Sequence, residues 1–386
     1  MAFLPSRSRI IITCSNRLSA YLEQEVRELG YLPTKVFKTG VELMGTFSDS
    51  IRLNLNLRCA SQVLYQLNSF KARNADALYE FLRTQRWEDL IAADGYFSIT
   101  SNVSNPTITN NLFANVRVKD AIVDRFRLQK GSRPDSGSAL DGIVIHLYWK
   151  DEQAEIFLDT SGETLSKHGY RKIPGKAPML ESLAAATILA TKWNRNSPFV
   201  NPMCGSGTLA IEAALIATNR RPGLFRENYS FMHVNGFDRS NYKKAISDLE
   251  RSIIPASAKF IATDISSDAV NISKVNASHA GVEELIRFEQ CDFAETPVPS
   301  EPGIIYFNPE YGDRLGSEKD LEALYKRMGD FMKTNCQGYL GYIFTGNLEL
   351  GKKIGLKPAR RIEFYTSKID CRLFEYELYK GSREKK

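Results

Sequence analysis

Four polar stretches follow apolar runs in the second half of the chain, and the last of them has the most distinctive chemistry. Asn308-Pro309-Glu310-Tyr311 comes directly after the apolar run Gly303–Phe307. The Asn308 amide oxygen and the Pro309 carbonyl oxygen can both accept hydrogen bonds from an amino group, and the Tyr311 ring can stack on a base turned out of its helix. Such acceptors hold a weakly nucleophilic amine in line with an electrophilic methyl group and favour the positive charge that develops on the nitrogen. The stretch therefore predicts methylation of an exocyclic amino group, with Asn308, Pro309 and Tyr311 as the catalytic residues.

The first stretch is a glycine turn, Asn201 to Thr208, between a predicted strand and a predicted helix. Gly205 and Gly207 would let backbone amides approach a ligand closely, with the N-terminus of the following helix near the ligand's polar groups. A tight strand–helix turn without a ligand has the same composition, so the turn alone does not decide between the two. As a cofactor site, it would use Asn201, Met203, Cys204, Gly205, Ser206, Gly207 and Thr208.

Two aspartates end the strands in between. Asp264 closes "KFIATD" and can accept hydrogen bonds from the hydroxyls of a ribose, with Ile265 as a further contact; its alternative role is to cap the following helix. Asp292, in Cys291-Asp292-Phe293, can accept from the amino group of an adenine while Phe293 packs on the ring. The alternative is a loop aspartate beside a core phenylalanine.

The order glycine turn, acid, acid, Asn-Pro-x-Tyr fits S-adenosylmethionine better than a dinucleotide. A pyrophosphate site would need the spacing G-x-G-x-x-G, with an acid about 20 residues further on. Here Ala210 occupies the third glycine position, and Asp264 lies much further along the chain. A methyl donor has no phosphates, so the turn need only admit its amino-acid tail and ribose. The spacing therefore predicts S-adenosyl-L-methionine as the cofactor and disfavours a nicotinamide dehydrogenase.

From about residue 179 the sequence predicts strictly alternating strands and helices, and these elements must position the four polar stretches. Alternation of this kind predicts a parallel sheet covered on both faces, with ligands at the carboxyl ends of its strands. Before residue 160 the strands and helices mix without strict alternation, which is typical of an α+β fold, and Ser50–Phe70 is predicted there as one helix. The predicted division is 1–55, 56–160, a linker at 161–178, and a Rossmann-like α/β domain at 179–386.

The composition is that of a soluble protein of the cytoplasm. Of 386 residues, 43% are hydrophobic and 25% charged, no apolar run is long enough to span a bilayer, and the N-terminus lacks the pattern of a signal peptide. The six cysteines form no C-x-x-C pair and the four histidines are dispersed, so we expect reduced thiols and no metal site. A net charge of +6 favours polyanionic partners only mildly.

Over nearly its whole length the sequence resembles the THUMP-domain guanine-N2 methyltransferases of 23S ribosomal RNA, and it is also close to their tRNA-modifying relatives. The matching stretches are "VKDAIVD", "LDTSGETLSKHGYR", "APMLESLAAA", "NPMCGSGTLAIEAALIATNRRPG" and "NPEYGDRLG". The resemblance implies a ferredoxin-like subdomain at 1–55 and an RNA-binding THUMP domain at 56–160. These would be joined to a class I S-adenosylmethionine-dependent methyltransferase domain whose Asn308, Pro309 and Tyr311 hold a guanine.

Two positions depart from the family's pattern. The family usually begins its glycine motif with aspartate, where this chain has Asn201, and it has a second proline where this chain has Glu310. The groups assigned to the chemistry survive, and what is lost at Glu310 is the fixed φ that proline imposes. We expect methyl transfer to be retained, with an altered rate or choice of base. Open alternatives are guanine-N2 methylation of tRNA, adenine-N6 methylation of DNA, and a catalytically silent RNA-binding homologue.

A basic helix predicted within residues 115–132 and the linker after it offer candidate contacts to RNA phosphates, which would position RNA without reading its sequence. Charges on a helix face are most often simply solvated, and that remains the alternative. The expected RNA-binding residues are Arg117, Lys119, Arg125, Arg127, Lys167 and Arg171.

Overall fold

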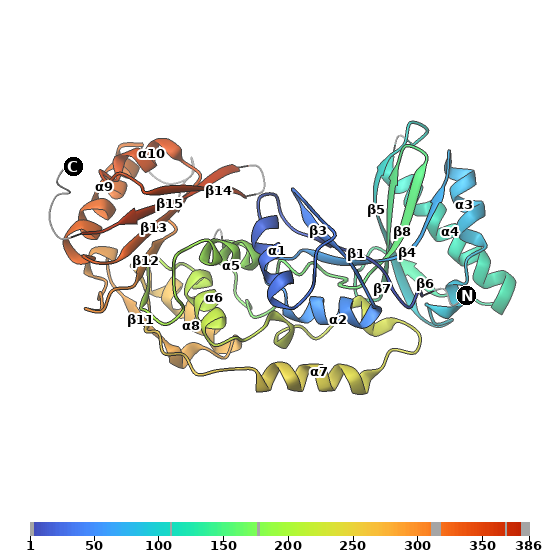
Figure 1. The fold of residues 1–386 in the computed structure, drawn as a ribbon, viewed down its shortest axis with the longest axis horizontal. Helices are drawn as coiled ribbons and strands as arrows, with labels where there is room; N and C mark the ends of the chain where they lie inside the picture. The colour runs from blue at the N-terminus through green and yellow to red at the C-terminus, as the bar shows by residue number, and fades with distance from the viewer. Residues whose placement is uncertain (1–3, 109, 176–177, 310–317, 367–368, 380–386) are drawn as a thin grey trace. The chain divides into compact units, whose positions relative to one another are not determined.

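The computed structural model describes residues 4–108, 110–175, 178–309, 318–366 and 369–379 (Figure 1). The chain divides into two compact units. The first unit contains Met1–Cys14, Leu22–Leu165 and Arg226–Asp248, and the second contains Ser15–Tyr21, Ser166–Phe225 and Leu249–Lys386. Ser15–Tyr21 therefore belongs to the second unit although the residues on either side of it build the first. Conversely, Arg226–Asp248 belongs to the first unit although its neighbours in sequence build the second. The predicted contiguous division did not include this exchange.

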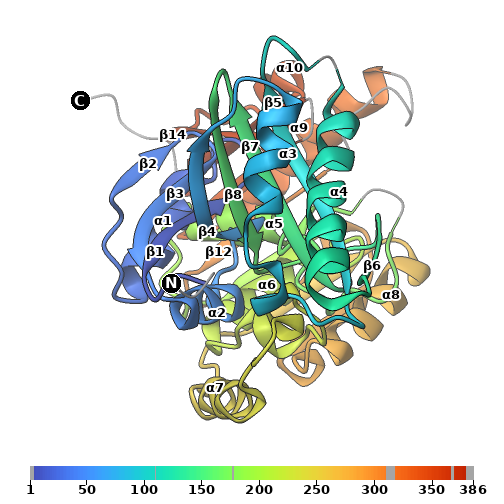
Figure 2. The same cartoon turned by 90° about the vertical axis from the view of Figure 1, so that its right-hand side faces the viewer.

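The first unit is built on an eight-stranded sheet with the strand order β2-β3-β1-β4-β8-β7-β5-β6. Strand β5 is parallel to β6 and β7, and the other neighbouring pairs are antiparallel. Helices α3 and α4 pack on each other and cover one face of β4, β5, β7 and β8 (Figure 2). The strands are β1 (Ser8–Thr13), β2 (Lys35–Phe37), β3 (Gly40–Gly45), β4 (Gln62–Lys71), β5 (Tyr96–Ser104), β6 (Asp135–Gly137), β7 (Ile143–Lys150) and β8 (Gln153–Asp159). The helices are α1 (Ser19–Glu28, which begins in the second unit), α2 (Phe47–Asn56), α3 (Ala75–Arg83) and α4 (Asn111–Lys130).

The single helix predicted over Ser50–Phe70 is wrong. Helix α2 ends at Asn56, and Gln62–Lys71 forms β4 in the middle of the sheet. Strand β4 pairs with β1 on one side and β8 on the other, so both of its edges find hydrogen-bond partners. These long-range pairings outweigh the helical pattern that the local sequence suggests.

The second unit contains an open, seven-stranded sheet with the order β11-β10-β9-β12-β13-β15-β14. Its first five strands are parallel, whereas β15 runs antiparallel to both of its neighbours. The chain order reverses between β9 and β12, as in doubly wound sheets, which confirms the predicted Rossmann-like α/β fold. The strands are β9 (Phe199–Pro202), β10 (Phe260–Asp264), β11 (Ile286–Gln290), β12 (Ile304–Phe307), β13 (Leu340–Thr345), β14 (Arg360–Thr366) and β15 (Ile369–Glu377). The helices are α5 (Glu181–Leu189), α6 (Thr208–Ala217), α8 (Ser267–His279), α9 (Glu318–Asn335) and α10 (Leu348–Lys353), while α7 (Arg239–Arg251) begins in the first unit and ends in the second.

The core of the second unit explains why its strands stop where the polar stretches begin. Strand β12 is buried throughout, and its Ile305 and Phe307 pack in one cluster with Tyr325, Met328 and other apolar residues of α9. Helix α6 is also buried along its whole length. With the strands fixed by apolar packing on both faces, their carboxyl ends are the part left for a ligand. None of the helices in the described ranges is long and apolar enough to cross a membrane.

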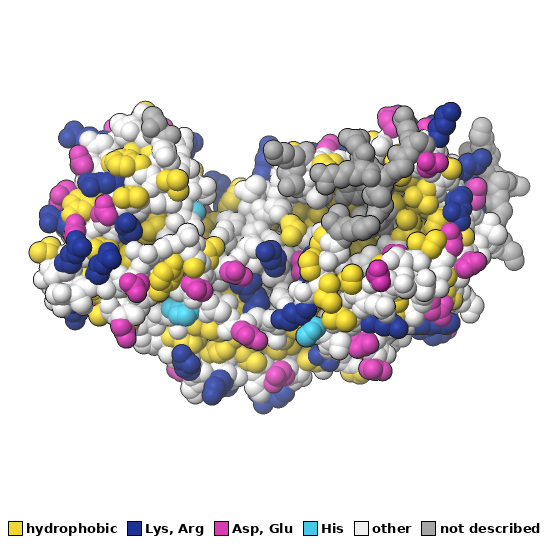
Figure 3. Space-filling model, turned by 180° about the vertical axis from the view of Figure 1, so that it is seen from behind, with side chains coloured by type: hydrophobic (Ala, Val, Ile, Leu, Met, Phe, Trp, Pro, Cys, Tyr) yellow, Lys and Arg dark blue, Asp and Glu magenta, His cyan; other side chains and the backbone are white. Residues whose placement is uncertain are grey.

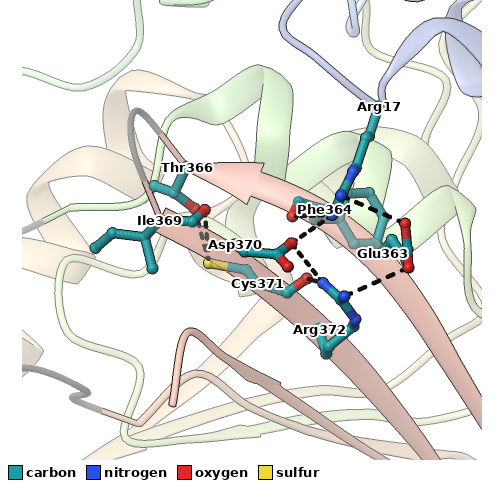
Figure 4. A network of polar contacts seen from close by, with 8 residues as sticks. All are labelled: Arg17, Glu363, Phe364, Thr366, Ile369, Asp370, Cys371 and Arg372. Carbon is teal, nitrogen blue, oxygen red and sulfur yellow. Dashed lines mark hydrogen bonds and ion pairs between the residues drawn. The ribbon is translucent and has the colours of Figure 1, made fainter. Parts of the chain in front are cut away.

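A short N-terminal segment belongs to the second unit and contacts the edge of its sheet. This segment, Ser15–Tyr21, is called the N-terminal clasp. The Arg17 guanidinium bonds to Asp370 and to the Phe364 carbonyl oxygen at 3.3 Å, and it lies 3.5 Å from Glu363 (Figure 4). The Tyr21 ring stacks on Phe364 with centroids 5.6 Å apart. The clasp therefore covers part of β14, the edge strand, with both a charged and an aromatic contact.

Candidate active site

The candidate site lies where β9 and β12 part at the carboxyl edge of the parallel sheet. The two strands are paired only at Phe199 with Ile304 and at Val200 with Ile305, and the ladder ends there. Because the chain order reverses at this point, the connections after β9 and β12 lead away in opposite directions, and ligands of doubly wound sheets bind outside the strand ends at such a point. Asn201 lies in β9, one residue before its end, and Asn308 directly follows β12, so the two asparagines flank this opening.

The glycine turn after β9 and the acid at the end of β10 are brought together as predicted. Met203, Gly205 and Gly207 have φ of 57°, 56° and 81°, left-handed values that bend the chain sharply into α6. The Gly205 amide donates to Asp264 Oδ2 at 3.0 Å, and Asp264 Oδ1 accepts from the Ser266 amide at 3.0 Å. The carboxylate thus holds both the turn and the start of α8, and each of its oxygens keeps a lone pair for a ribose hydroxyl.

Asn201 bridges the two strands at the point where their ladder ends. Its Nδ2 donates to the Tyr306 carbonyl oxygen at 2.9 Å, and the residue is 1% exposed. Its Oδ1 is buried and has no hydrogen-bond partner within the described part of the chain. The same is true of Asn308 Oδ1 at the end of β12. An unpaired buried acceptor costs about 1–3 kcal/mol, so two of them on either side of one opening indicate a ligand with N–H donors.

The acid after β11 is held by an arginine that the sequence did not suggest. Asp292 Oδ1 accepts from the Ala294 amide and from Arg327 on α9, each at 2.9 Å. Burial acts to raise the pKa of Asp292, but the bond from Ala294 and the bond and charge of Arg327 outweigh it and lower that pKa. Asp292 is therefore held in its ionised form beside the site.

The Phe293 ring is part of the hydrophobic core. It is 6% exposed, packs edge-to-face on Phe307 and Phe331, and has the Arg327 guanidinium 4.8 Å above it. This environment supports the alternative of a core phenylalanine rather than an adenine-stacking residue. Ile265, next to Asp264, is 69% exposed and offers the apolar contact instead.

Two residues that sequence reasoning missed fix the linker against the glycine turn. Asn276 on α8 accepts from the Lys172 and Ile173 amides and donates to the Ser206 carbonyl oxygen at 3.2 Å. Ser273, one turn earlier, donates to the Gly205 carbonyl oxygen at 2.8 Å. Their spacing of three along an amphipathic helix was the available signal. The linker and the turn therefore form one bonded layer beside the site.

The proposed RNA-binding arginines are engaged in bonds within their own units. Arg117 pairs with Asp76 at 2.9 Å and lies 4.4 Å above the Tyr79 ring, and Arg125 bonds to both carboxylate oxygens of Glu88. Pairs also join Arg127 to Asp124 at 3.2 Å and Lys119 to Asp120 at 4.0 Å. In the linker, Arg171 donates to Thr208 Oγ1 at 2.8 Å and to the Met179 carbonyl oxygen, whereas Lys167 is exposed. These bonds favour structural roles for Arg125 and Arg171.

We expect Arg125→Ala to lower the stability of the protein rather than its affinity for RNA. Both side chains of the Arg125–Glu88 pair are mostly buried, so the variant loses about 1 kcal/mol in the free energy of unfolding, measured by urea denaturation. Arg127→Ala is the matched variant, because its side chain is 61% exposed. A shallower salt dependence of RNA binding for Arg127→Ala supports a phosphate contact, and unchanged dependence assigns the face to solvent. Weakened RNA binding by a fully stable Arg125→Ala would contradict the structural role.

The residues at the site fit S-adenosylmethionine. The buried Asn201 Oδ1 can accept from the donor's ammonium group, and Asp264 can hold the ribose hydroxyls. A Cβ on Gly205 would meet none of the described atoms within 4 Å, so the turn is open there for the donor's amino-acid tail. Tyr311 and Glu310 lie outside the described residues. Over the described ranges, no group of three or more His, Cys, Asp or Glu is arranged to hold a metal ion.

Comparison with known families identifies each part of the chain. An RlmL ferredoxin-like domain matches residues 9–64, a THUMP domain matches 72–159, and an RMKL-like methyltransferase domain matches 168–375, more than half of the chain. The sequence is 33% identical over 384 residues to the ribosomal RNA large subunit methyltransferase K/L of Syntrophotalea carbinolica. That match covers 96% of this chain but 53% of the relative, so the chain spans about half the length of that protein.

Solved structures agree with this assignment. A predicted N6-adenine-specific DNA methylase from Listeria monocytogenes is 31% identical, with a TM-score of 0.86 and 96% of each chain covered. SMU.472, a putative methyltransferase complexed with S-adenosylhomocysteine, shares the fold with a TM-score of 0.87 at 24% identity, over 98% of this chain and all of that one. S-adenosyl-L-methionine is the methyl donor of such domains, in line with the predicted cofactor. The chain belongs to the RMKL-like methyltransferase family, with ferredoxin-like and THUMP domains preceding a class I S-adenosylmethionine-dependent methyltransferase fold.

Proposed function

We propose that this protein transfers a methyl group from S-adenosylmethionine to the exocyclic N2 amine of a guanine in 23S ribosomal RNA. The observation that carries the proposal is the shielded, unpaired Oδ1 of Asn308, which faces no donor in the described structure and stands at the end of β12. An amino group supplies the missing donor. The name of the Syntrophotalea relative and the THUMP match support RNA as the substrate.

The roles of the residues follow from their positions. Asn308 Oδ1 and the Pro309 carbonyl accept hydrogen bonds from the two N–H groups of the guanine amine and aim its nitrogen at the methyl group. The bound donor supplies an electrophilic methyl group on a sulfonium. The same two acceptors stabilise the positive charge that grows on the nitrogen, and the amine loses a proton to solvent after transfer. Tyr311 is proposed to stack on the turned-out base.

Asn201 connects the two halves of this arrangement. Its Nδ2 bond to the Tyr306 carbonyl fixes β12 two residues before Asn308, while its Oδ1 is left for the donor's ammonium group. The amide thus serves both sides of the opening, which an aspartate at this position could do only when protonated. This gives a physical role to the departure from the family's usual residue.

The test is a methylation assay with the full chain and labelled donor, offered unmodified 23S ribosomal RNA, tRNA and double-stranded DNA. We expect label in ribosomal RNA, recovered after digestion as N2-methylguanosine. Label recovered as N6-methyl-2′-deoxyadenosine from DNA would favour the activity in the name of the Listeria protein, which the same acceptors can serve. Donor binding without label in any nucleic acid would show a catalytically silent protein and end the proposal.

A further inference from the structure

Arg327 is the one guanidinium among the described residues that bonds to the Asp292 carboxylate. It extends from α9, and its Nη2 donates to Asp292 Oδ1 at 2.9 Å. The Ala294 amide donates to the same oxygen, so Oδ1 is shared between two donors. Asp292 Oδ2 has no hydrogen bond within the described ranges, and the Asp292 side chain is 31% exposed. One oxygen is thus fixed and the other is free and accessible.

The guanidinium is itself held in place by an aromatic contact. It lies 4.8 Å from the centroid of the Phe293 ring, which is buried between Phe307 and Phe331. A guanidinium over a ring face gains about 0.5–1 kcal/mol even at an exposed site. Arg327 is 54% exposed, and an ion pair of that exposure alone would be loosely held. With the ring beneath it, the side chain has two contacts that restrict it to one position.

An aspartate fixed in this way discriminates between purines. The free Oδ2 is an acceptor, and an ionised carboxylate has no proton to donate. It accepts from the 6-amino group of adenine and repels the 6-oxo group of hypoxanthine. Burial opposes ionisation, but the hydrogen bond from the Ala294 amide and the bond and charge of Arg327 together lower the pKa of Asp292, which keeps the carboxylate in the discriminating form.

We propose that Arg327 is a positioning residue for the donor's adenine: it orients the Asp292 carboxylate so that Oδ2 meets the 6-amino group. The inference rests on the proposed placement of adenine at Asp292. Arg327 itself does not touch the ligand, and it acts through the shared oxygen Oδ1. The consequence is that a residue of α9, beyond the catalytic stretch, sets part of the cofactor specificity.

The test measures binding by calorimetry with two probes, S-adenosyl-L-homocysteine and S-inosyl-L-homocysteine, which differ only in the 6-amino and 6-oxo groups. We expect Arg327→Ala to weaken the binding of S-adenosylhomocysteine about fivefold to tenfold, in line with the loss of one charge-assisted bond. The same variant should leave the weak affinity for S-inosylhomocysteine unchanged. Arg327→Lys restores part of the affinity. The double variant with Asp292→Ala binds no more weakly than Asp292→Ala alone, because both act on one bond.

Lys333→Ala is the matched control, since Lys333 lies on the same helix and pairs with Asp330 at 3.2 Å. It should leave both affinities unchanged. The proposal would be overturned if Arg327→Ala weakened the binding of both probes equally. It would also be overturned if the losses of affinity added up in the double variant. Wild-type affinity in Asp292→Ala would remove the adenine assignment and the inference with it. A protein that binds S-adenosylhomocysteine as expected but methylates no RNA leaves the inference standing while the proposed function fails.

Discussion

Asn308→Ala is expected to lower kcat for methyl transfer by about 100- to 1000-fold, the usual cost of removing one preorganised polar group from a transition state. The alanine removes the shielded oxygen that is proposed to accept a hydrogen bond from the amine, and with it the contact that would align the amine nitrogen. Cofactor affinity should stay within about twofold, because no cofactor contact is assigned to Asn308. Single-turnover rates and calorimetry with S-adenosylhomocysteine separate the two effects.

Asn308→Asp is the informative companion to the alanine variant. It keeps an oxygen at the same position and is therefore expected to retain more activity than alanine, provided that the protein folds as the wild type does. The thermal midpoint of each variant controls for stability. A kcat near the wild-type value in Asn308→Ala would show that the amine is held elsewhere, and a loss of S-adenosylhomocysteine binding would place the residue in the cofactor site instead.

Asp264→Ala is expected to weaken the binding of S-adenosylhomocysteine by about 100-fold. Hydrogen bonds to a charged group contribute about 1.5–3 kcal/mol each, and the carboxylate both holds the Gly205 amide and is proposed to accept from the ribose. The alanine removes the proposed ribose acceptor and, at the same time, the side chain that bonds to the Gly205 amide of the glycine turn. Calorimetry with the full chain gives the change in Kd.

Asp264→Asn divides these two contributions. The asparagine keeps one acceptor oxygen for the turn but lacks the charge, so an intermediate affinity is expected. Asp268→Ala is the matched control, because Asp268 is an exposed aspartate in the first turn of α8, the helix that follows Asp264. Unchanged binding by Asp264→Ala would assign the carboxylate to the turn and cap alone, which is the alternative that its bond to Ser266 supports.

The sequence located the strand ends because apolar runs and the polar residues after them are local signals. Asp264 and Gly205 come together as predicted, since parallel strands place their carboxyl ends at one edge of the sheet. The role of Phe293 could not be read locally, because burial under Arg327 depends on a helix that lies further along the chain. The ion pair of Arg125 could not be read locally for a related reason: its carboxylate partner, Glu88, is 37 residues away.

The exchange of segments was also invisible to local patterns. Ser15–Tyr21 looks like the start of a helix, and nothing in its composition indicates a partner in β14 or β15. Strand β4 was missed likewise, because its pairing with β1 and β8 involves residues distant in sequence. In each case a contact between residues distant in sequence determined the structure of the segment, and such a contact cannot be predicted from the neighbouring residues alone.

The N-terminal clasp imposes an order on folding. Arg17 and its partner Asp370 are 353 positions apart in the sequence, so the clasp can close only when the whole segment between them has been synthesised. Contacts of such separation form slowly and late. A protein cut at residue 166 would lack the clasp and leave the edge strand β14 open to pairing with other chains. The methyltransferase unit is therefore expected to remain soluble and correctly folded only when Ser15–Tyr21 is present in the same molecule as β14 and β15.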